Sequence, residues 1–539
     1  MGDLQRGKRY ARRQFSGLLD ESLSPSRNPG LVMAQNVVYR RFGAVGKRTG
    51  TSSYGAQFSS SPIVSGVRWY RAQPSALKQM ILQTADGNLW VGNDITGVCT
   101  NIGTLAAGAT PAFFAAAYDP AESGVSGTPA SDILIIAYGS GPPMKWDGTH
   151  LTQLNSSIAN HFTGCCFWHN HVFLWGDPNN PDTVFATDLG NPESYVFSTS
   201  YGGYLIGQGD GDPTVQVCVP LGPTLAVFKT SSVYAMAGYD FYAGDYQFQL
   251  APWLSDAGTT APHSVAVVRG TLVFWNGQSF YRLFPNALEA INIGLPLLQS
   301  TALIAQGNQS LMRSVAGDFL VQTAGGYQSY TGVYLCAVDS GDGAADEICV
   351  YDDDATQFAG KPAWTKWAGL TVGALVPWGG PGDLKLLYIG SGLAGSAALL
   401  GGSPTADVGT TPIDVVVQTG RDTGGNDETI KNVGQLYLNV ESTSATFVIE
   451  VVTDQLSTSA TTQVVDAVTG IPAVVGTAVV GIAQVGPLIS TQYQSSSAPI
   501  EPSLRGRNFQ FQISESSATS AYEIVELAYY IEAEETLRR

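Results

Sequence analysis

The chain has 539 residues, of which 44% are hydrophobic and only 13% are charged, whereas roughly a quarter of the residues in an average soluble domain are charged. Its length predicts two or three domains rather than one core. The six cysteines match neither a disulfide framework nor a zinc site, and neither a secretory leader nor an apolar stretch of roughly 18 residues is evident, so we expect buried thiols, a reducing cytoplasm and no membrane insertion.

The basic residues concentrate at the N-terminal end. Residues 1–50 hold ten Lys and Arg against three Asp and Glu, although the whole chain has a formal net charge of −17. A basic segment on an acidic body either contacts nucleic acid or docks on an acidic neighbouring subunit, and we favour the second interpretation. The acidic body argues against nucleic acid gripping it, because phosphate binding depends on Lys and Arg, but it suits a wall past which DNA slides.

The first segment, residues 1–61, is predicted to be a basic extended arm. Residues 33–43 have the pattern of a strand and a turn, and they lie between two turn-rich loops at residues 24–30 and 50–55. The segment has too few apolar residues to fold alone. We therefore expect it to lie along the next domain or along a neighbouring chain.

Residues 62–405 repeat one pattern: a short apolar strand, a tight turn with Gly, Asn or Asp, and a second strand with an aromatic residue. Residues 80–92 read MILQTADGNLWVG, and residues 271–283 read TLVFWNGQSFYRL. The other copies cover residues 132–148, 171–186, 224–236, 332–351 and 384–401. Four-stranded blades of roughly 40–50 residues have this spacing. We predict an all-β fold with a β-propeller of six to eight blades; a set of β-sandwiches is the alternative.

Residues 410–539 lose this period but keep the pattern of strands. The predicted strands cover residues 413–418, 434–440, 446–452, 473–482, 509–513 and 521–531. Turns rich in Ser and Thr separate them. The segment is therefore predicted to form a C-terminal β-sandwich that ends in a short tail.

Two short motifs resemble catalytic sequences but have a structural explanation. Residues 84–90, TADGNLW, approach the aspartate box of sialidase propellers but lack one residue of its spacing. A hairpin turn closed by Asp86 and Gly87 is favoured instead. Residues 169–171, HNH, lack the context of a ββα-metal nuclease and are expected at the corner between two strands.

Acidic loops at residues 210–212, 339–347 and 352–354 offer oxygen ligands for Ca²⁺, but none has EF-hand spacing, so solvated turns are favoured. The tryptophans lie mostly in predicted strands, where packing between blades is favoured over stacking on sugars. We therefore predict that the protein is not an enzyme and that it has no catalytic residue, no cofactor and no metal site.

Two segments at opposite ends of the chain carry a resemblance to a known family. Residues 35–50 read QNVVYRRFGAVGKRTG. Residues 505–513 read RGRNFQFQI, and the strand YEIVELA follows at residues 522–528. In this order around a propeller, the segments resemble the propeller-bearing tail proteins of tailed bacteriophages, including the tail-nozzle proteins of short-tailed phages.

The resemblance implies a virion structural protein, made in the cytoplasm of a bacterial host and located in the virion tail. Such a subunit forms a nozzle-like ring, expected to be a hexamer, around the DNA exit channel. It attaches to the adaptor or portal side of the tail and contacts adaptor and fibre or spike proteins, and genomic DNA passes it without sequence recognition.

As partner-binding residues we predict the basic side chains of the N-terminal motif, Arg40, Arg41, Lys47 and Arg48. Two alternatives to the structural role remain open. One is a host-surface propeller at the tail tip that binds or cleaves glycans. The other is a propeller scaffold that is not viral.

Overall fold

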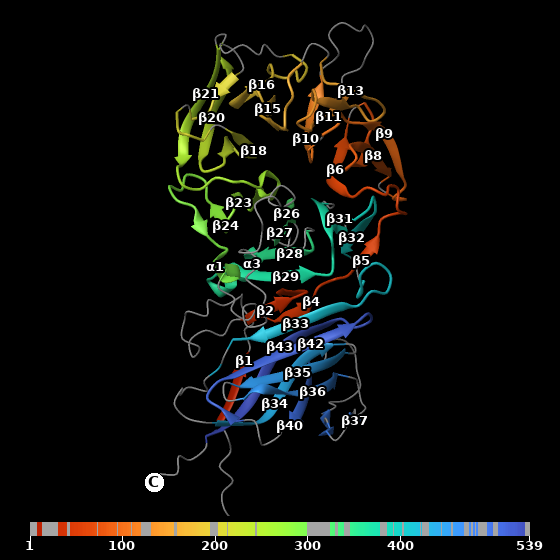
Figure 1. Cartoon of the computed structure of the whole chain (residues 1–539), viewed down its shortest axis with the longest axis vertical. Helices are drawn as coiled ribbons and strands as arrows, with labels where there is room; N and C mark the ends of the chain where they lie inside the picture. The colour runs from red at the N-terminus through yellow and green to blue at the C-terminus, as the bar shows by residue number, and fades with distance from the viewer. Residues whose placement is uncertain are drawn as a thin grey trace, which may run out of the picture.

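The computed structural model shows a ring of strands at one end of an elongated molecule and a layered β-domain at the other (Figure 1). The described residues are 8–12, 31–39, 44–72, 74–93, 95–108, 110–119, 131–155, 159–194, 203–207, 209–212, 214–242, 245–298, 324–328, 333–338, 345–377, 385–391, 393–401, 404–420, 422, 431–442, 445–453, 456–467, 474–475, 478–479, 481–482, 493–499 and 505–533.

Within these residues, blades 1 to 5 of the ring each consist of four antiparallel strands that follow one another in the chain. Blade 1 contains β6 (Ile63–Arg71), β7 (Leu77–Thr84), β8 (Asn88–Asn93) and β9 (Cys99–Thr104), and blade 2 contains β10 (Phe113–Asp119), β11 (Ser131–Ala137), β12 (Met144–Trp146) and β13 (Leu151–Gln153). Blade 3 contains β14 (Gly164–Trp168), β15 (His171–Asp177), β16 (Asn180–Ala186) and β17 (Gly203–Leu205), and blade 4 contains β18 (Val215–Leu221), β19 (Thr224–Lys229), β20 (Val233–Tyr242) and β21 (Asp245–Leu254). Blade 5 contains β22 (Ala266–Val268), β23 (Thr271–Trp275), β24 (Phe280–Leu283) and β25 (Ile291–Asn292).

Blade 6 also consists of four consecutive strands, whereas blade 7 takes one strand from the N-terminal segment. Blade 6 contains β26 (Ala324–Gln328), β27 (Val333–Val338), β28 (Glu347–Asp352) and β29 (Ala363–Ala368). Blade 7 contains β30 (Val372–Pro377), β31 (Lys385–Ser391) and β32 (Ala397–Gly401), and its fourth strand is β5 (Thr51–Ser53) from the N-terminal segment. Ser52 pairs with Leu399 in this last blade, so a strand that precedes the repeat region completes it.

The fold therefore includes a seven-bladed β-propeller, which confirms the prediction of six to eight blades. Each of the seven sequence repeats forms the second and third strands of one blade, as residues 80–92 do for β7 and β8. The first strands of consecutive blades contact one another around the ring, and the contact between β30 and β6 closes it (Figure 1).

Buried aromatic side chains fill the space between blades. Trp175, Trp275 and Trp364 are among the largest fully buried side chains. Gly164 explains how closely these rings pack, because a Cβ at this position would lie 2.2 Å from two carbons of the Trp175 indole. Gly164 lies opposite Trp175 within blade 3 and so leaves room for a ring whose Nε1 donates to the carbonyl oxygen of Gln216 in blade 4.

The C-terminal domain is a β-sandwich, as predicted. One of its sheets contains β1 (Lys8–Arg12), β3 (Val37–Tyr39), β4 (Val45–Lys47), β34 (Lys431–Ser442), β39 (Gly481–Ile482), β40 (Tyr493–Pro499), β41 (Arg505–Gly506) and β43 (Tyr522–Ala533). The other contains β2 (Leu31–Gln35), β33 (Ile413–Thr419), β35 (Ala445–Thr453), β36 (Leu456–Ala467) and β42 (Phe509–Ser517). A separate hairpin joins β37 (Val474–Val475) to β38 (Ala478–Val479).

One sheet runs through both domains. β2 pairs in parallel with β29 of blade 6 and antiparallel with β33 of the sandwich, which produces a continuous sheet of nine strands. One hydrophobic cluster likewise includes Trp275 of blade 5, Trp364 of blade 6 and Phe511 of the sandwich. The described parts of residues 1–61 are therefore strands of both domains and not a separate arm.

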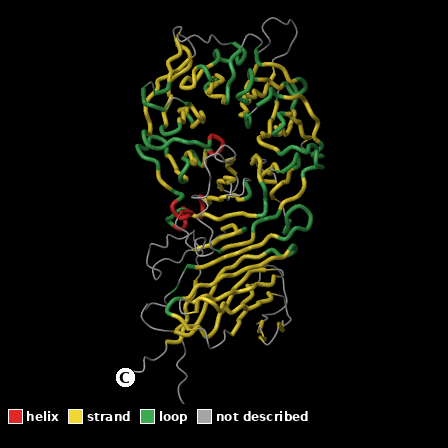
Figure 2. The backbone as a smooth tube through the Cα atoms, in the orientation of Figure 1, coloured by secondary structure: helices red, strands yellow, loops and turns green. Residues whose placement is uncertain are grey.

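Helical structure is sparse in the described residues. It comprises the 3₁₀ turn η3 (Pro262–Ser264), α1 (Leu295–Leu298) and α3 (Asp353–Ala359), while strands and loops make up the rest of the coloured tube in Figure 2. No described helix is long and apolar enough to cross a membrane.

Candidate functional site

The two predicted partner-binding residues that the structure describes are buried inside the chain. Arg48 is 2% exposed, and its guanidinium binds both carboxylate oxygens of Asp407, with Nη1 2.9 Å from Oδ1 and Nη2 2.5 Å from Oδ2. Lys47 is also buried, and its Nζ lies 3.0 Å from Oε2 of Glu515. These contacts differ from the expected surface contacts to a neighbour. Arg40 and Arg41 lie outside the described residues.

Lys47 and Arg48, with their partners Glu515 and Asp407, form a junction between the N-terminal segment and the domains around it. Asn36 also lies at this junction, in the turn between β2 and β3. It has a φ of 55°, a left-handed conformation that Asn adopts more readily than most residues. Its Nδ2 donates to the carbonyl oxygen of Asp414 at 2.7 Å, and its Oδ1 accepts from Nε of Arg48 and from the backbone N–H of Ala368. One side chain thus connects blade 6, the sandwich and the N-terminal segment.

Gly50 follows Arg48 and Thr49 at a close approach of two backbones. A Cβ at Gly50 would lie 2.0 Å from the carbonyl oxygen of Ala406, so only glycine fits. The Asn, Arg and Gly of the N-terminal motif therefore serve one junction, together with Asp407 and Glu515. Sequence reasoning missed these two carboxylates because nothing in their local sequence separates them from other acidic residues.

The two segments that carry the family resemblance lie side by side in the structure. β4 pairs with β43, with Val45 opposite Ile524 and Gly46 opposite Glu523. Lys47 reaches Glu515 on β42 of the opposite sheet. Segments more than 450 residues apart in sequence thus form one structural unit beneath the propeller.

His263 lies near the axis of the propeller. Its ring, on η3 before blade 5, stacks on Phe113 of blade 2 with the ring centroids 4.2 Å apart, and its Nε2 lies 3.2 Å from the carbonyl oxygen of Pro111. Phe113 also contacts Trp175 of blade 3. Burial lowers the pKa of His263 to about 4, so the ring is neutral at pH 7 and packs as an apolar plug.

The motifs that resemble catalytic sequences form turns. Oδ1 of Asp86 accepts hydrogen bonds from the hydroxyl of Thr84 and the backbone N–H of Asn88 within the β7–β8 hairpin. His169 and Asn170 have φ values of 48° and 59° and form the tight turn between β14 and β15. Both structural interpretations are confirmed.

The described acidic loops hold structural contacts. Asp352 caps α3 by accepting from the backbone N–H of Ala355 at 2.8 Å, while the neighbouring Asp353 binds Arg282. Asp210 binds the buried Lys229 at 2.8 Å; burial opposes its ionisation, but the hydrogen bond from Lys229 is among those that lower its pKa. Within the described ranges, no group of three or more His, Cys, Asp or Glu residues could hold a metal ion. The loop at residues 339–344 lies outside them.

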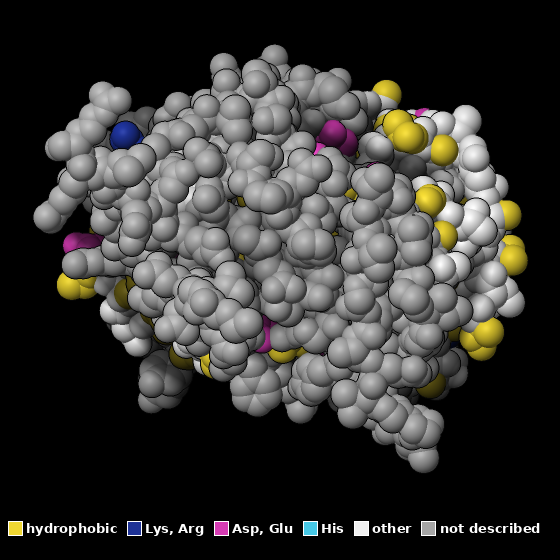
Figure 3. Space-filling view, turned by 90° about the horizontal axis from the view of Figure 1, so that it is seen from below, with side chains coloured by type: hydrophobic (Ala, Val, Ile, Leu, Met, Phe, Trp, Pro, Cys, Tyr) yellow, Lys and Arg dark blue, Asp and Glu magenta, His cyan; other side chains and the backbone are white. Residues whose placement is uncertain are grey.

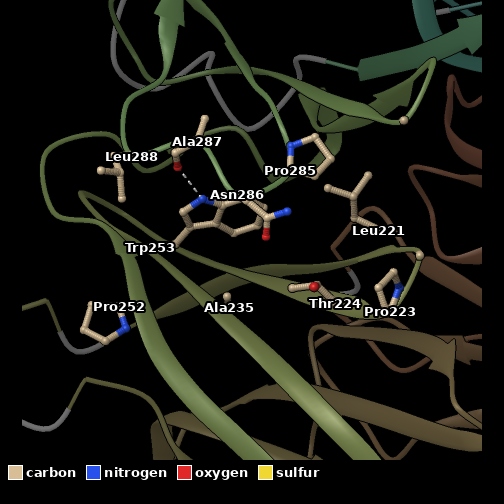
Figure 4. Close-up of a pocket in the computed structure, with 12 residues that line it drawn as sticks. Leu221, Pro223, Thr224, Ala235, Pro252, Trp253, Pro285, Asn286, Ala287 and Leu288 are labelled. Atoms are coloured by element: carbon tan, nitrogen blue, oxygen red, sulfur yellow. Dashed lines mark hydrogen bonds between the residues drawn. The ribbon is translucent and has the colours of Figure 1, made fainter.

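A pocket with a volume of about 510 Å³ lies between blades 4 and 5. Blade 4 contributes the turn between β18 and β19 and part of β21 to its walls. Blade 5 contributes the turn between β22 and β23 and the loop between β24 and β25 (Figure 4). They comprise Leu221, Gly222, Pro223, Thr224, Ala235, Pro252, Trp253, Gly270, Pro285, Asn286, Ala287 and Leu288. None of these side chains is charged, and the volume is in the usual range for a binding pocket.

Few charged side chains are seen among the described residues on the end of the molecule opposite the propeller (Figure 3). In Figure 3, few of the coloured side chains are acidic or basic, and the hydrophobic ones lie mainly around the rim. The described part of this end thus offers no basic patch for nucleic acid.

Comparisons with known proteins identify no relative by sequence. No family model matches the chain, and no curated protein matches it. A solved structure, "YCF48 bound to D1 peptide", is 11% identical over 64% of this chain and 96% of that one, with a TM-score of 0.36. Likeness at this level carries no functional argument, and the fold rests on the blades described above.

Proposed function

We propose that this chain is a non-enzymatic structural subunit of a bacteriophage tail. It forms part of a nozzle-like ring around the DNA exit channel and attaches to the adaptor or portal side of the tail. The observation that carries the proposal is the junction beneath the propeller, where the two segments that resemble tail proteins pair with each other. In this proposal the residues of the junction share one mechanical role, which is to hold the domains together.

The junction suits a subunit that transmits force. A continuous sheet joins blade 6 to the sandwich, and buried ion pairs hold the N-terminal segment against both domains. A sheet that crosses a domain boundary resists hinge motion, because bending it would break the hydrogen bonds of its ladder. In this proposal the junction stiffens the subunit, as a rigid channel wall needs.

The charge of the chain suits the passage of DNA. A net charge of −17 repels phosphate, so DNA slides along such a wall without being retained. Other partners in this proposal are further copies of the chain and the adaptor and fibre or spike proteins of the tail. The ring is proposed to be a hexamer in the virion, assembled from subunits made in the host cytoplasm.

The glycan-binding alternative has less support. It calls for a concave face with several exposed Trp, Tyr and Asp side chains. The pocket between blades 4 and 5 has one Trp, no Tyr and no Asp among its walls. A binding site on that pattern would need more hydrogen-bonding side chains than this pocket has.

Immunogold labelling of intact particles, with an antibody against the C-terminal domain, tests the proposal. Gold at the tail axis of every particle is the expected result, because a ring subunit occupies that axis. Gold on peripheral fibres, or particles without gold, would contradict it. An antibody against a capsid protein serves as the control for labelling efficiency.

A further inference from the structure

The pocket between blades 4 and 5 is built for an apolar occupant. Its one aromatic ring is Trp253, whose Nε1 donates to the carbonyl oxygen of Ala287 at 2.8 Å (Figure 4). The indole N–H is therefore satisfied within the chain, while the face of the indole remains part of the wall. Three prolines, two leucines and two alanines line the rest, and only Thr224 and Asn286 have polar side chains there. Such a lining gains most from burying an aliphatic side chain.

The rim of the pocket is unusually apolar for a surface. Leu288 is 89% exposed at its edge. Phe284 in the same loop, Ile291 on β25 and Leu295 on α1 are exposed as well. Single exposed apolar residues are ordinary, but several together mark an interaction surface. The loop between β24 and β25 thus exposes Leu288 at the pocket and Phe284 within the same loop.

A projecting apolar loop lies on blade 1. Ile95, between β8 and β9, is 91% exposed, the highest value among the described large hydrophobic side chains, and Val98 is exposed beside it. The loop is held in place, since Oδ1 of Asn93 accepts from the backbone N–H groups of Ile95 and Thr96 at 2.9 Å and 3.0 Å.

The N-terminal segment braces the same loop. The hydroxyl of Tyr54 donates to the carbonyl oxygen of Asn93 at 2.7 Å. Gly97 packs directly on Gly55, where a Cβ on Gly97 would lie 2.5 Å from the backbone nitrogen of Gly55. A loop fixed in this way loses little conformational entropy when it binds. It therefore presents Ile95 as a preformed projection.

The projection and the pocket lie on opposite flanks of the propeller. β8 and β9 are on one side of the ring in Figure 1, whereas β21, β23 and β24 are on the other. A surface that fits a different surface on the next copy produces a head-to-tail contact, which closes into a ring when the rotation between copies allows it. The pocket walls and the Ile95 and Val98 side chains are uncharged. Asp94 adjoins Ile95 and the exposed Glu289 adjoins Leu288 in sequence, so the contact should strengthen as added salt screens these carboxylates.

We propose that the pocket between blades 4 and 5 binds the Ile95 loop of a second copy of this chain. Ile95 enters the pocket beside Trp253, and Val98 covers Leu288 at the rim. The inference rests on the proposed function for the place of the ring in a virion. The contact between copies can be measured on the isolated protein. The contact can therefore be absent while the tail role holds, and the tail role can be wrong while the contact is present.

Mixing two variants tests this contact. The changes are Ile95→Glu, which spoils the projection, and Leu288→Glu, which spoils the pocket rim; both residues are so exposed that the fold is unaffected. Light scattering after size-exclusion chromatography should find multimers of the wild type and only monomers of each variant. An equal mixture should produce dimers and nothing larger, because each pair retains one intact projection and one intact pocket.

The control is Leu189→Glu, which adds the same charge at an exposed leucine of blade 3 and should leave assembly unchanged. Wild-type protein that stays monomeric at the highest attainable concentration would overturn the proposal. So would variants that assemble like the wild type, or a mixture of the two that stays monomeric.

Cysteine trapping provides a second measurement that detects a weak contact. The double variant Ile95→Cys with Leu288→Cys should produce a ladder of covalent multimers under mild oxidation, whereas Ile95→Cys with Leu189→Cys should not. Equal ladders from both proteins would overturn the proposal. Binding of maltotriose or N-acetylglucosamine oligomers to a monomeric wild type would also overturn the proposal if the change Trp253→Ala removes that binding.

Discussion

Blades 1 to 5 and the junction between the domains are built in different ways. Each of those blades consists of four consecutive strands, so its contacts are between residues close in sequence. The junction depends on contacts such as Arg48 with Asp407 and Lys47 with Glu515, which are separated by 359 and 468 positions. Local hairpins form readily, whereas distant segments must overcome a larger loss of chain entropy before they meet.

The comparison shows where each region obtains its specificity. The blades use a repeated pattern of apolar strands and tight turns, and no single residue determines the arrangement. The junction uses a few buried polar side chains with exact partners, and a buried charge that loses its partner is costly. The propeller should therefore tolerate substitutions that stay within its pattern, while the junction should not.

The largest expected effect comes from breaking the junction at Arg48. The change Arg48→Met leaves the carboxylate of Asp407 with only the hydroxyl of Thr51 at 3.1 Å. We expect the free energy of unfolding to fall by about 3–5 kcal/mol, measured by urea denaturation. Amide hydrogen exchange should increase in both blade 7 and the sandwich, since Arg48 lies between them.

Two further variants test the cause of this loss. Arg269→Met removes a partly exposed guanidinium that pairs with the exposed Asp354 and lies 3.4 Å from the buried Asp353. Asp353 keeps its contact with Arg282, so this change should cost only about 1 kcal/mol. Adding Asp407→Leu to Arg48→Met should recover part of the stability, because no unpaired charge then remains. A loss at Arg48 no larger than that at Arg269 would contradict the account of the junction.

A cavity in one blade should have a smaller and more local effect. Leu174 on β15 is fully buried in blade 3. The change Leu174→Ala should lower the free energy of unfolding by about 3 kcal/mol. Hydrogen exchange should rise in blades 2 to 4 and stay unchanged in the sandwich. Equal increases in both domains would mean that the blades are not the local units described above.

Acid should weaken the centre of the propeller through His263. Its pKa is about 4 in the folded chain against 6.5 without burial, so the unfolded chain binds the proton more readily. The stability from this group is present above pH 6.5 and is lost as the pH falls towards 4. His263→Gln should remove about 3 kcal/mol of this pH dependence, measured as the difference between urea titrations of the two proteins. Identical pH profiles would contradict the role of the plug.

The smallest effect is expected at a single hairpin turn. The change Asp86→Ala removes exposed hydrogen bonds to Thr84 and Asn88 and should cost at most about 1 kcal/mol. Thermal unfolding followed by circular dichroism measures it. A loss comparable to that of Arg48→Met would mean that blade turns also have residues on which the whole fold depends.

The sequence predicts the local region well and the junction poorly. The repeats at residues 80–92 and 271–283 locate β7–β8 and β23–β24 because alternating apolar residues and an Asp-Gly or Asn-Gly turn are readable in one short window. The strand predicted at residues 446–452 lies within β35 for the same reason. No window of this size contains both Arg48 and Asp407, so their pairing could not be inferred.

Burial of the basic motif was equally beyond local sequence. Lys47 and Arg48 follow Arg40 and Arg41 in a basic stretch, a pattern typical of an exposed surface. The carboxylate that pairs with Lys47 comes from β42, and the carboxylate that pairs with Arg48 comes from the loop after β32. Only the three-dimensional structure identifies their function as holding the chain together.

Cryo-electron microscopy of intact particles tests the central claim of a ring-forming tail subunit most directly. The account predicts a ring of seven-bladed propellers around the tail axis, with the Ile95 loop of each copy against the pocket between blades 4 and 5 of the next. The sandwich should keep the same orientation to the propeller in every copy. Propellers on peripheral fibres, propellers that do not contact one another, or particles that lack the protein would contradict it.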